Sequence, residues 1–158
     1  MSLYDWLLFL HVLAAFLLVS ALVLHSFLIA SARNADVPSD FLRNFRLSII
    51  GDALAGIGSI GTLVFGIWLA IQVDAYHVWD GWVIAALVLW AAYGGVGGRA
   101  SKRYARARDR ARALAAEGDA PSGELKALVR DPRALTLHVV SAGFVLLLLL
   151  DMIFKPGA

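Results

Sequence analysis

Hydrophobic residues along this chain fall into four long runs separated by shorter polar segments. The runs cover residues 3–32, 47–73, 82–98 and 134–154, and they contain only isolated acidic residues such as Asp52. A helix needs about 20 apolar residues to cross a bilayer, and it satisfies its own backbone hydrogen bonds there. The pattern therefore predicts an all-α fold, a four-transmembrane-helix bundle that forms one integral membrane domain over residues 1–158.

Composition favours a membrane protein over a soluble one. Hydrophobic residues make up 60% of the 158 residues and charged residues 16%, and the mean hydropathy is +0.74. Soluble domains are only about 45–50% apolar. The first run is interpreted as a true span, because no basic residue precedes it and it is too long for a secretory signal peptide. The absence of cysteine excludes disulfides, thiolate zinc sites and cysteine nucleophiles.

The distribution of Lys and Arg predicts the orientation. Thirteen basic residues lie between spans one and two or in the segment 99–133, whereas the opposite side has only Lys155. Basic loops stay in the cytoplasm, so we expect both termini outside the membrane and residues 99–133 inside the cell. Aromatic residues at the outer interface agree with this orientation: Tyr4, Trp6, Tyr76, Trp79 and Trp82.

The segment from Arg99 to Arg112 is rich in Ala and Arg, which favour helix, and it follows directly on the third span. We expect a long basic cytoplasmic helical extension that ends near Glu117 and contacts anionic lipid head groups. Nucleic acid is not an expected partner, although the charge would allow one. Residues 124–130 are expected to resume a helix, and residues 39–48 to form a short interfacial lead-in to the second span.

Small residues recur along the second span, which contains five glycines: Gly51, Gly56, Gly58, Gly61 and Gly66. Small residues let helix backbones approach closely in a bilayer, so this span is expected to be packed and not lipid-facing. Three uses stay open for its glycines. They are packing inside one bundle, room for a flat cofactor, and a seam with a second copy or another membrane protein.

Three histidines lie inside spans, where ionisable side chains are uncommon and usually functional. His11 and His25 are 14 residues apart on the first span, as are His138 and Met152 on the fourth, and this spacing returns a helix to nearly the same face. In antiparallel spans His25 would lie level with His138, and His11 with Met152. Haem b takes two such axial ligands for its iron. We therefore predict haem between His25 and His138, with a second site at His11 and Met152.

The alternative is that no metal binds and that each histidine forms hydrogen bonds to a neighbouring helix or to Asp52. Asp52 has three potential partners, which are Arg46, His25 and His138. The sequence contains no catalytic carboxylate pair, no nucleophile and base arrangement and no dinucleotide motif. Catalytic residues therefore stay unassigned.

Four short motifs resemble those of a bacterial family of predicted integral membrane proteins of unassigned function. They are Leu10-His11-Val12, the stretch from Thr62 to Leu69, Gly81-Trp82 and the ending from Asp151 to Pro156. More distantly, the sequence is similar to the HemJ-type protoporphyrinogen oxidases and the CopD-like copper proteins, in which a first-span histidine and haem are implicated. By that likeness these residues fall on family positions: His11, Gly66, Trp68, Gly81, Trp82, Gly98, Arg99, Lys155 and Pro156.

The chain departs from the oxidase pattern in the third span. Where the oxidases carry a histidine and a lysine it has the stretch from Val83 to Ala86, and where they carry a histidine pair it has Gly94 and Gly95. These departures imply that the chain lacks protoporphyrinogen oxidase activity. The sequence favours a small inner-membrane protein that binds haem b in a redox or cofactor-handling role. A HemJ-like porphyrinogen oxidase and a cofactor-free accessory or packing subunit are the alternatives.

Overall fold

The computed structural model describes residues 2–72 and 77–156, and its regular structure there is entirely helical. Six helices follow one another in these residues: α1 (Leu3–Ala32), α2 (Pro38–Phe45), α3 (Ser48–Gln72), α4 (Gly81–Ala116), α5 (Gly123–Val129) and α6 (Pro132–Phe154). Four helical stretches are long and apolar enough to cross a membrane, namely α1, α2 with α3, α4, and α5 with α6. The predicted all-helical class with four candidate spans is confirmed. Val73 and Tyr76, which the sequence assigns to a span and to the interface, lie outside the described residues.

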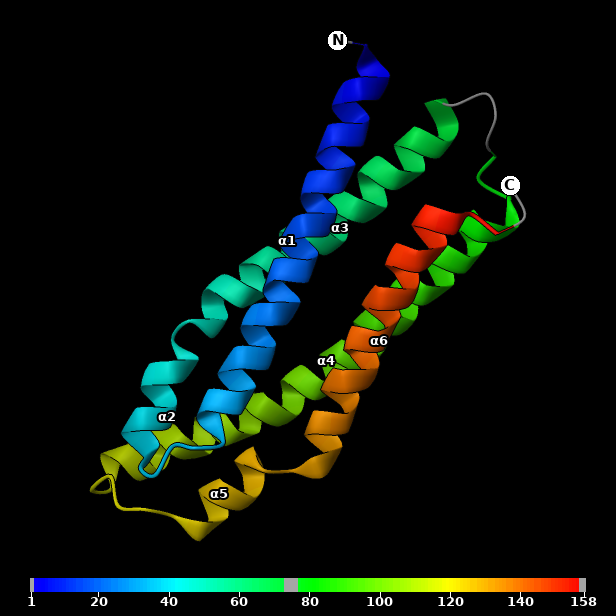
Figure 1. Ribbon diagram of the computed structural model, residues 1–158. Helices are drawn as coiled ribbons and strands as arrows, with labels where there is room; N and C mark the ends of the chain where they lie inside the picture. The colour runs from blue at the N-terminus through cyan, green and yellow to red at the C-terminus, as the bar shows by residue number, and fades with distance from the viewer. Residues whose placement is uncertain (1, 73–76, 157–158) are drawn as a thin grey trace.

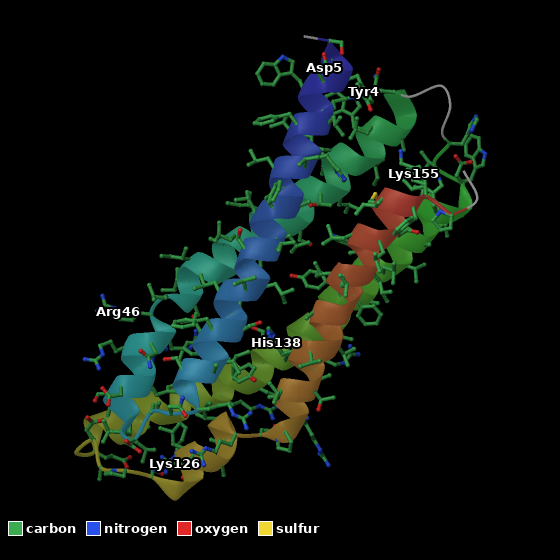
Figure 2. The ribbon with its side chains drawn as sticks, in the orientation of Figure 1. Tyr4, Asp5, Arg46, Lys126, His138 and Lys155 are labelled. Carbon is green, nitrogen blue, oxygen red and sulfur yellow. The ribbon has the colours of Figure 1, made fainter. Side chains whose placement is uncertain are left out.

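The long helices form two antiparallel pairs. α1 packs mainly against α3 and α4 mainly against α6, and the pairs touch each other sparsely along their apolar lengths. Figure 1 shows that α1 begins and α6 ends at the same end of the molecule, which we call the terminal end. The opposite end holds α5 and is called the α5 end. Tyr4 and Lys155 mark the terminal end, and Arg46 and Lys126 lie towards the α5 end (Figure 2).

Hydrogen bonds connect the two pairs in the described part of the chain. The Trp90 indole N–H on α4 donates to the Ser59 carbonyl on α3, at 3.1 Å. The Ser26 hydroxyl oxygen on α1 lies 2.8 Å from Nε2 of His138 on α6. Lipid tails are as apolar as the side chains that face them, so helices in a bilayer associate through close packing and polar contacts of this kind. These bonds define which faces of the two pairs oppose each other.

Close packing of α1 on α3 centres on Gly58. A Cβ atom there would lie 2.5 Å from the Leu18 amide nitrogen and 2.8 Å from the Ala14 carbonyl oxygen, so the two backbones are in direct contact. The predicted close packing of this span is confirmed on that face. On the opposite face Gly56 has no atom within 4 Å of the place a Cβ would take, and Ile57 is 61% exposed. In the single chain this second face is therefore exposed, and the seam with a second chain that the glycines would allow there stays a prediction.

The second half of α4 forms a small hydrophobic core with its neighbours at the α5 end. α4 runs without a break to Ala116, with Glu117 as its C-cap, and its buried face is alanine-rich. α2 and α5 pack on this face together with the end of α1. We call the resulting cluster the cap core, and its buried members are Ala32, Phe41, Ala107, Ala111, Leu125 and Val129.

Ion pairs surround the cap core. Arg103 pairs with Asp131 at 2.7 Å and Arg110 with Glu124 at 2.8 Å. Asp131 also caps α6 by accepting the Arg133 backbone N–H. That backbone bond and the Arg103 guanidinium lower the pKa of Asp131, so the carboxylate stays charged at neutral pH and holds the start of α6 against α4. Part of the predicted lipid-binding charge on α4 is therefore used within the chain.

Candidate functional site

Two cavities lie between the α1–α3 pair and the α4–α6 pair. The first has a volume of about 270 Å³ and is lined by His11 and Met152. The second has a volume of about 300 Å³ and is lined by His25 and His138. We call them the His11 cavity and the His25 cavity. The structure thus brings each predicted pair of site residues to one common cavity, at two different depths.

The His11 ring lies against a glycine on the facing helix. A Cβ atom at Gly66 would lie 2.9 Å from Cε1 of His11, so glycine leaves room for the imidazole in this position. His11 is half-buried, and its Nδ1 is shielded from solvent and makes no hydrogen bond of standard geometry with the described residues. The Thr62 backbone lies close enough to the ring to interact with it. A buried polar nitrogen without a partner costs free energy. Such a group is a candidate contact for a ligand.

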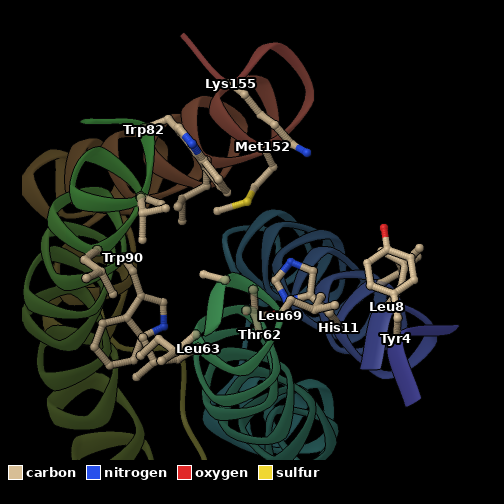
Figure 3. A pocket seen from close by; sticks show the side chains of 18 residues that line it. Tyr4, Leu8, His11, Thr62, Leu63, Leu69, Trp82, Trp90, Met152 and Lys155 are labelled. Carbon is tan, nitrogen blue, oxygen red and sulfur yellow. The ribbon is translucent and has the colours of Figure 1, made fainter. Parts of the chain in front are cut away.

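Aromatic and sulfur-containing side chains form the opposite wall of the His11 cavity. Trp82 and Trp90 extend from α4, and Met152 and Lys155 from α6, around the space that the His11 ring enters (Figure 3). The Lys155 ammonium lies 5.5 Å from the centre of the Trp82 ring, a cation–π distance. The cavity is therefore an apolar space bordered by an imidazole, a thioether and a cation.

The two histidines of the His25 cavity have hydrogen-bond partners. Nδ1 of His25 lies 2.8 Å from the Ala21 carbonyl oxygen, and its Nε2 lies 3.1 Å from Oδ1 of Asp52. Nε2 of His138 is bonded to the Ser26 hydroxyl oxygen. Of the three potential partners of Asp52, the structure places His25 beside it. This arrangement corresponds to the alternative in which the histidines bind protein groups.

The observed hydrogen bonds decide how well each pair suits haem. An axial histidine must direct a nitrogen lone pair at the iron. In the His25 cavity both nitrogens of His25 are engaged, and Nε2 of His138 is engaged as well. This pair does not fit haem unless those bonds break. His11 and Met152 fit better, because Nδ1 of His11 makes no hydrogen bond of standard geometry in the described structure and both side chains face one cavity.

Two tryptophans were not identified as cavity residues from the sequence. Trp82 was assigned to the outer interface, but it is only 7% exposed and packs against Ala70 and Val83. Its ring therefore faces the protein and not the lipid, and its depth in the membrane stays a prediction. Trp90 received no role, although Trp82, Ala86 and Trp90 recur every four residues and so share one face of a helix. All three line the His11 cavity.

Comparison with known proteins gives the chain a family. No curated protein and no solved structure matches it, so the resemblance to the HemJ-type and CopD-like proteins stays a prediction. A family model described as "Predicted integral membrane protein (DUF2269)" matches residues 5–156. The chain therefore belongs to this DUF2269 family of predicted integral membrane proteins, whose function is unknown.

Proposed function

We propose that this membrane protein binds an apolar small molecule with one polar group in the His11 cavity. The apolar part of the ligand lies against Trp82 and Trp90, and its polar group pairs with the His11 imidazole. The observation that carries the proposal is the buried Nδ1 of His11, which makes no hydrogen bond of standard geometry with the described residues, beside a mostly apolar cavity. Small-molecule sites commonly combine a mostly apolar lining with a few polar groups placed to orient the ligand.

The size and position of the cavity narrow the ligand class. Its volume of about 270 Å³ lies just below the range of about 300–1,000 Å³ typical of small-molecule pockets. This volume suits a single ring or a short chain better than a large macrocycle. The cavity opens between two helix pairs that make few contacts with each other, so a longer apolar tail can extend between the pairs. A membrane-soluble molecule meets both conditions.

Haem b is the second candidate. It is favoured by His11 and Met152, which line the same cavity from α1 and α6, because imidazole and thioether are known axial ligands. Bound haem would supply one-electron transfer. The chain would then act as a redox subunit, and His11 and Met152 are the residues that would hold the group.

Replacing His11 with alanine tests the proposal. The variant loses the polar contact, which is worth about 1–3 kcal/mol for a buried group, so ligand affinity should fall by about 5-fold to 150-fold. The measurement is mass spectrometry of small molecules that co-purify with the protein in mild detergent, together with its visible absorption spectrum. A haem spectrum would favour the second candidate, and a non-haem molecule lost with His11 would favour the first.

Matched controls separate a site effect from a folding effect. His77→Ala removes a histidine that stacks on Trp79 away from the cavity, so it should leave the bound molecule unchanged. Gly66→Leu should act like loss of His11, because a side chain there takes the place of the ring. If the same molecules co-purify with the wild type, with His11→Ala and with Gly66→Leu, the proposal is overturned.

We further propose that the terminal end faces outward from a bacterial inner membrane. The support is the division of basic residues, thirteen of which lie in the two segments that approach the α5 end, against Lys155 at the terminal end. Lys102 and Arg106 are exposed on α4, where they can meet anionic lipid head groups.

A reporter fusion tests this orientation. A reporter that is active only in the cytoplasm should be silent when fused after Ala158 and active when inserted between Glu117 and Pro121, in the turn after α4. Basic residues control orientation in this way because they resist translocation. The reverse pattern of activities would show that the α5 end faces outward.

A further inference from the structure

We propose that His25 and Asp52 form a proton-binding site within the spans. Together the two side chains hold one proton more than a neutral imidazole and an ionised carboxylate would hold. The site is separate from the His11 cavity and does not depend on any ligand there. It takes its proton from water and returns it to water, so no electron moves and no co-reactant is needed.

Hydrogen-bond donors and acceptors around His25 require this extra proton. A carbonyl oxygen only accepts, so Nδ1, at 2.8 Å from the Ala21 carbonyl, must carry a hydrogen. The second nitrogen, Nε2, lies 3.1 Å from Oδ1 of Asp52. A neutral imidazole with hydrogen on Nδ1 has only a lone pair on Nε2, which cannot bond to a carboxylate. The proton must therefore sit either on Nε2 or on Asp52.

A glycine fixes the imidazole in this position. A Cβ atom at Gly51 would lie 2.7 Å from Cε1 of His25 and 3.1 Å from its Nδ1, so α3 presents bare backbone to the ring. The ring is thus held between the Ala21 carbonyl of its own helix and the Asp52 carboxyl of the next. Gly51 and Asp52 are adjacent in sequence, so one turn of α3 both makes room for the ring and supplies its acidic partner.

Asp52 is the exposed member of the pair and lies near the start of α3. Asp52 is the fifth residue of α3, which begins at Ser48, so at 1.5 Å per residue it lies about 6 Å from the helix start. Its side chain is 62% exposed, against 27% for His25. The carboxyl is therefore the exposed end of the pair and the imidazole its buried end.

Other titratable groups face the pair from the opposite helices. His138 lines the cavity from α6, and Tyr93, Tyr104 and Arg108 line it from α4. Ser26 gives its hydroxyl hydrogen to the Leu22 carbonyl, so it accepts from Nε2 of His138. His138 therefore donates a hydrogen bond to Ser26 on α1, whether its imidazole is neutral or charged. Among the described residues that line this cavity, Asp52 supplies the carboxyl group. It is therefore the carboxylate acceptor for the donors around it.

Nuclear magnetic resonance of the wild-type protein tests the proposal directly. In protein labelled with ¹⁵N-histidine and ¹³C-aspartate in lipid nanodiscs at neutral pH, we expect one of two spectra. Either His25 shows two protonated ring nitrogens, or Asp52 shows the carbon signal of a protonated carboxylic acid. Either result supports the site. A neutral His25 beside an ionised Asp52 would overturn it.

An Asp52→Asn variant serves as the comparison. An amide group can donate to Nε2 without an extra proton, so His25 should become neutral while the signal of His77 stays unchanged. Because the primary measurement uses the wild type, a variant that folds poorly does not decide the question. Retention of the doubly protonated His25 signal in a folded Asp52→Asn variant would also contradict the pairing. Loss of the His11 ligand would leave all these spectra unaffected, so the two proposals fail independently.

Discussion

Replacing Gly58 with leucine is expected to separate α1 from α3 and to prevent accumulation of folded protein. Even the Cβ atom of the new side chain would lie 2.5 Å from the Leu18 amide nitrogen, and this contact is with backbone that cannot rotate away. Overpacking costs about 1–3 kcal/mol and occasionally more, and here the whole side chain must be accommodated between two helices. Gel filtration and the thermal unfolding midpoint in detergent measure the loss.

Gly56 provides the matched control two residues away on the same helix. A Cβ atom there meets nothing within 4 Å, so Gly56→Leu adds only another lipid-facing apolar side chain. Its unfolding midpoint should equal or exceed that of the wild type, because leucine also favours helix over glycine. If both variants lose folded protein to the same extent, either the face of α3 that meets α1 is wrongly assigned, or the Gly56 face is itself covered by another chain.

The position of each span follows from the sequence, but the pairing of the spans does not. Runs of apolar residues predict the long helices because the bilayer leaves few alternatives for the backbone. Hydropathy says nothing about which helix lies beside which, since every span is apolar all round. The contacts that select α1 for α3 are short-range, such as Gly58 against Ala14 and Leu18. These depend on shape, which a single sequence does not display.

The histidine spacing predicts two pairs of side chains at two depths, and each pair lines one cavity in the structure, but the spacing does not show which atoms the side chains bind. His11 and His25 share one face of α1, and each meets a glycine on α3, namely Gly66 and Gly51. The two glycines are 15 residues apart and the two histidines 14. This near match is visible in the sequence and indicates where each ring finds room on α3. The bond from His25 to Asp52 depends on side-chain rotamers, so it could only be named as one of three options.

The cap core could be predicted only in outline. The sequence indicates helices near α2, the second half of α4 and α5, and the structure has them at residues 38–45, 81–116 and 123–129. Their packing was not expected, because the segment after the third span was interpreted as a basic surface helix. Alanines spaced four residues apart, Ala107 and Ala111, are both 0% exposed and form a narrow apolar stripe among the arginines. Such a stripe is easily overlooked in a charged sequence.

Phe41→Ala is expected to unfold the cap core while leaving the spans paired. Phe41 is 1% exposed and stacks on Phe45, with ring centroids 5.3 Å apart. Loss of a buried phenylalanine costs about 3–5 kcal/mol, which is a large part of what a small cluster of helices can supply. Local unfolding of this kind exposes backbone to proteases. Trypsin should therefore cut rapidly at the arginines of the second half of α4.

The location of the cuts distinguishes a local effect from a global one. Phe27→Ala removes the same side chain from a position that is 67% exposed on α1, so the protease pattern should match the wild type. In Phe41→Ala, cleavage should concentrate between Arg103 and Arg112 and at Arg43 and Arg46 of the unfolded α2. The fragments that contain α1 and α3 should stay associated in detergent after these cuts, because the contacts of Gly58 do not involve α2. Equal resistance to trypsin in wild type and Phe41→Ala would show that the second half of α4 is held by its ion pairs with Asp131 and Glu124. The cap core would then contribute little to its stability.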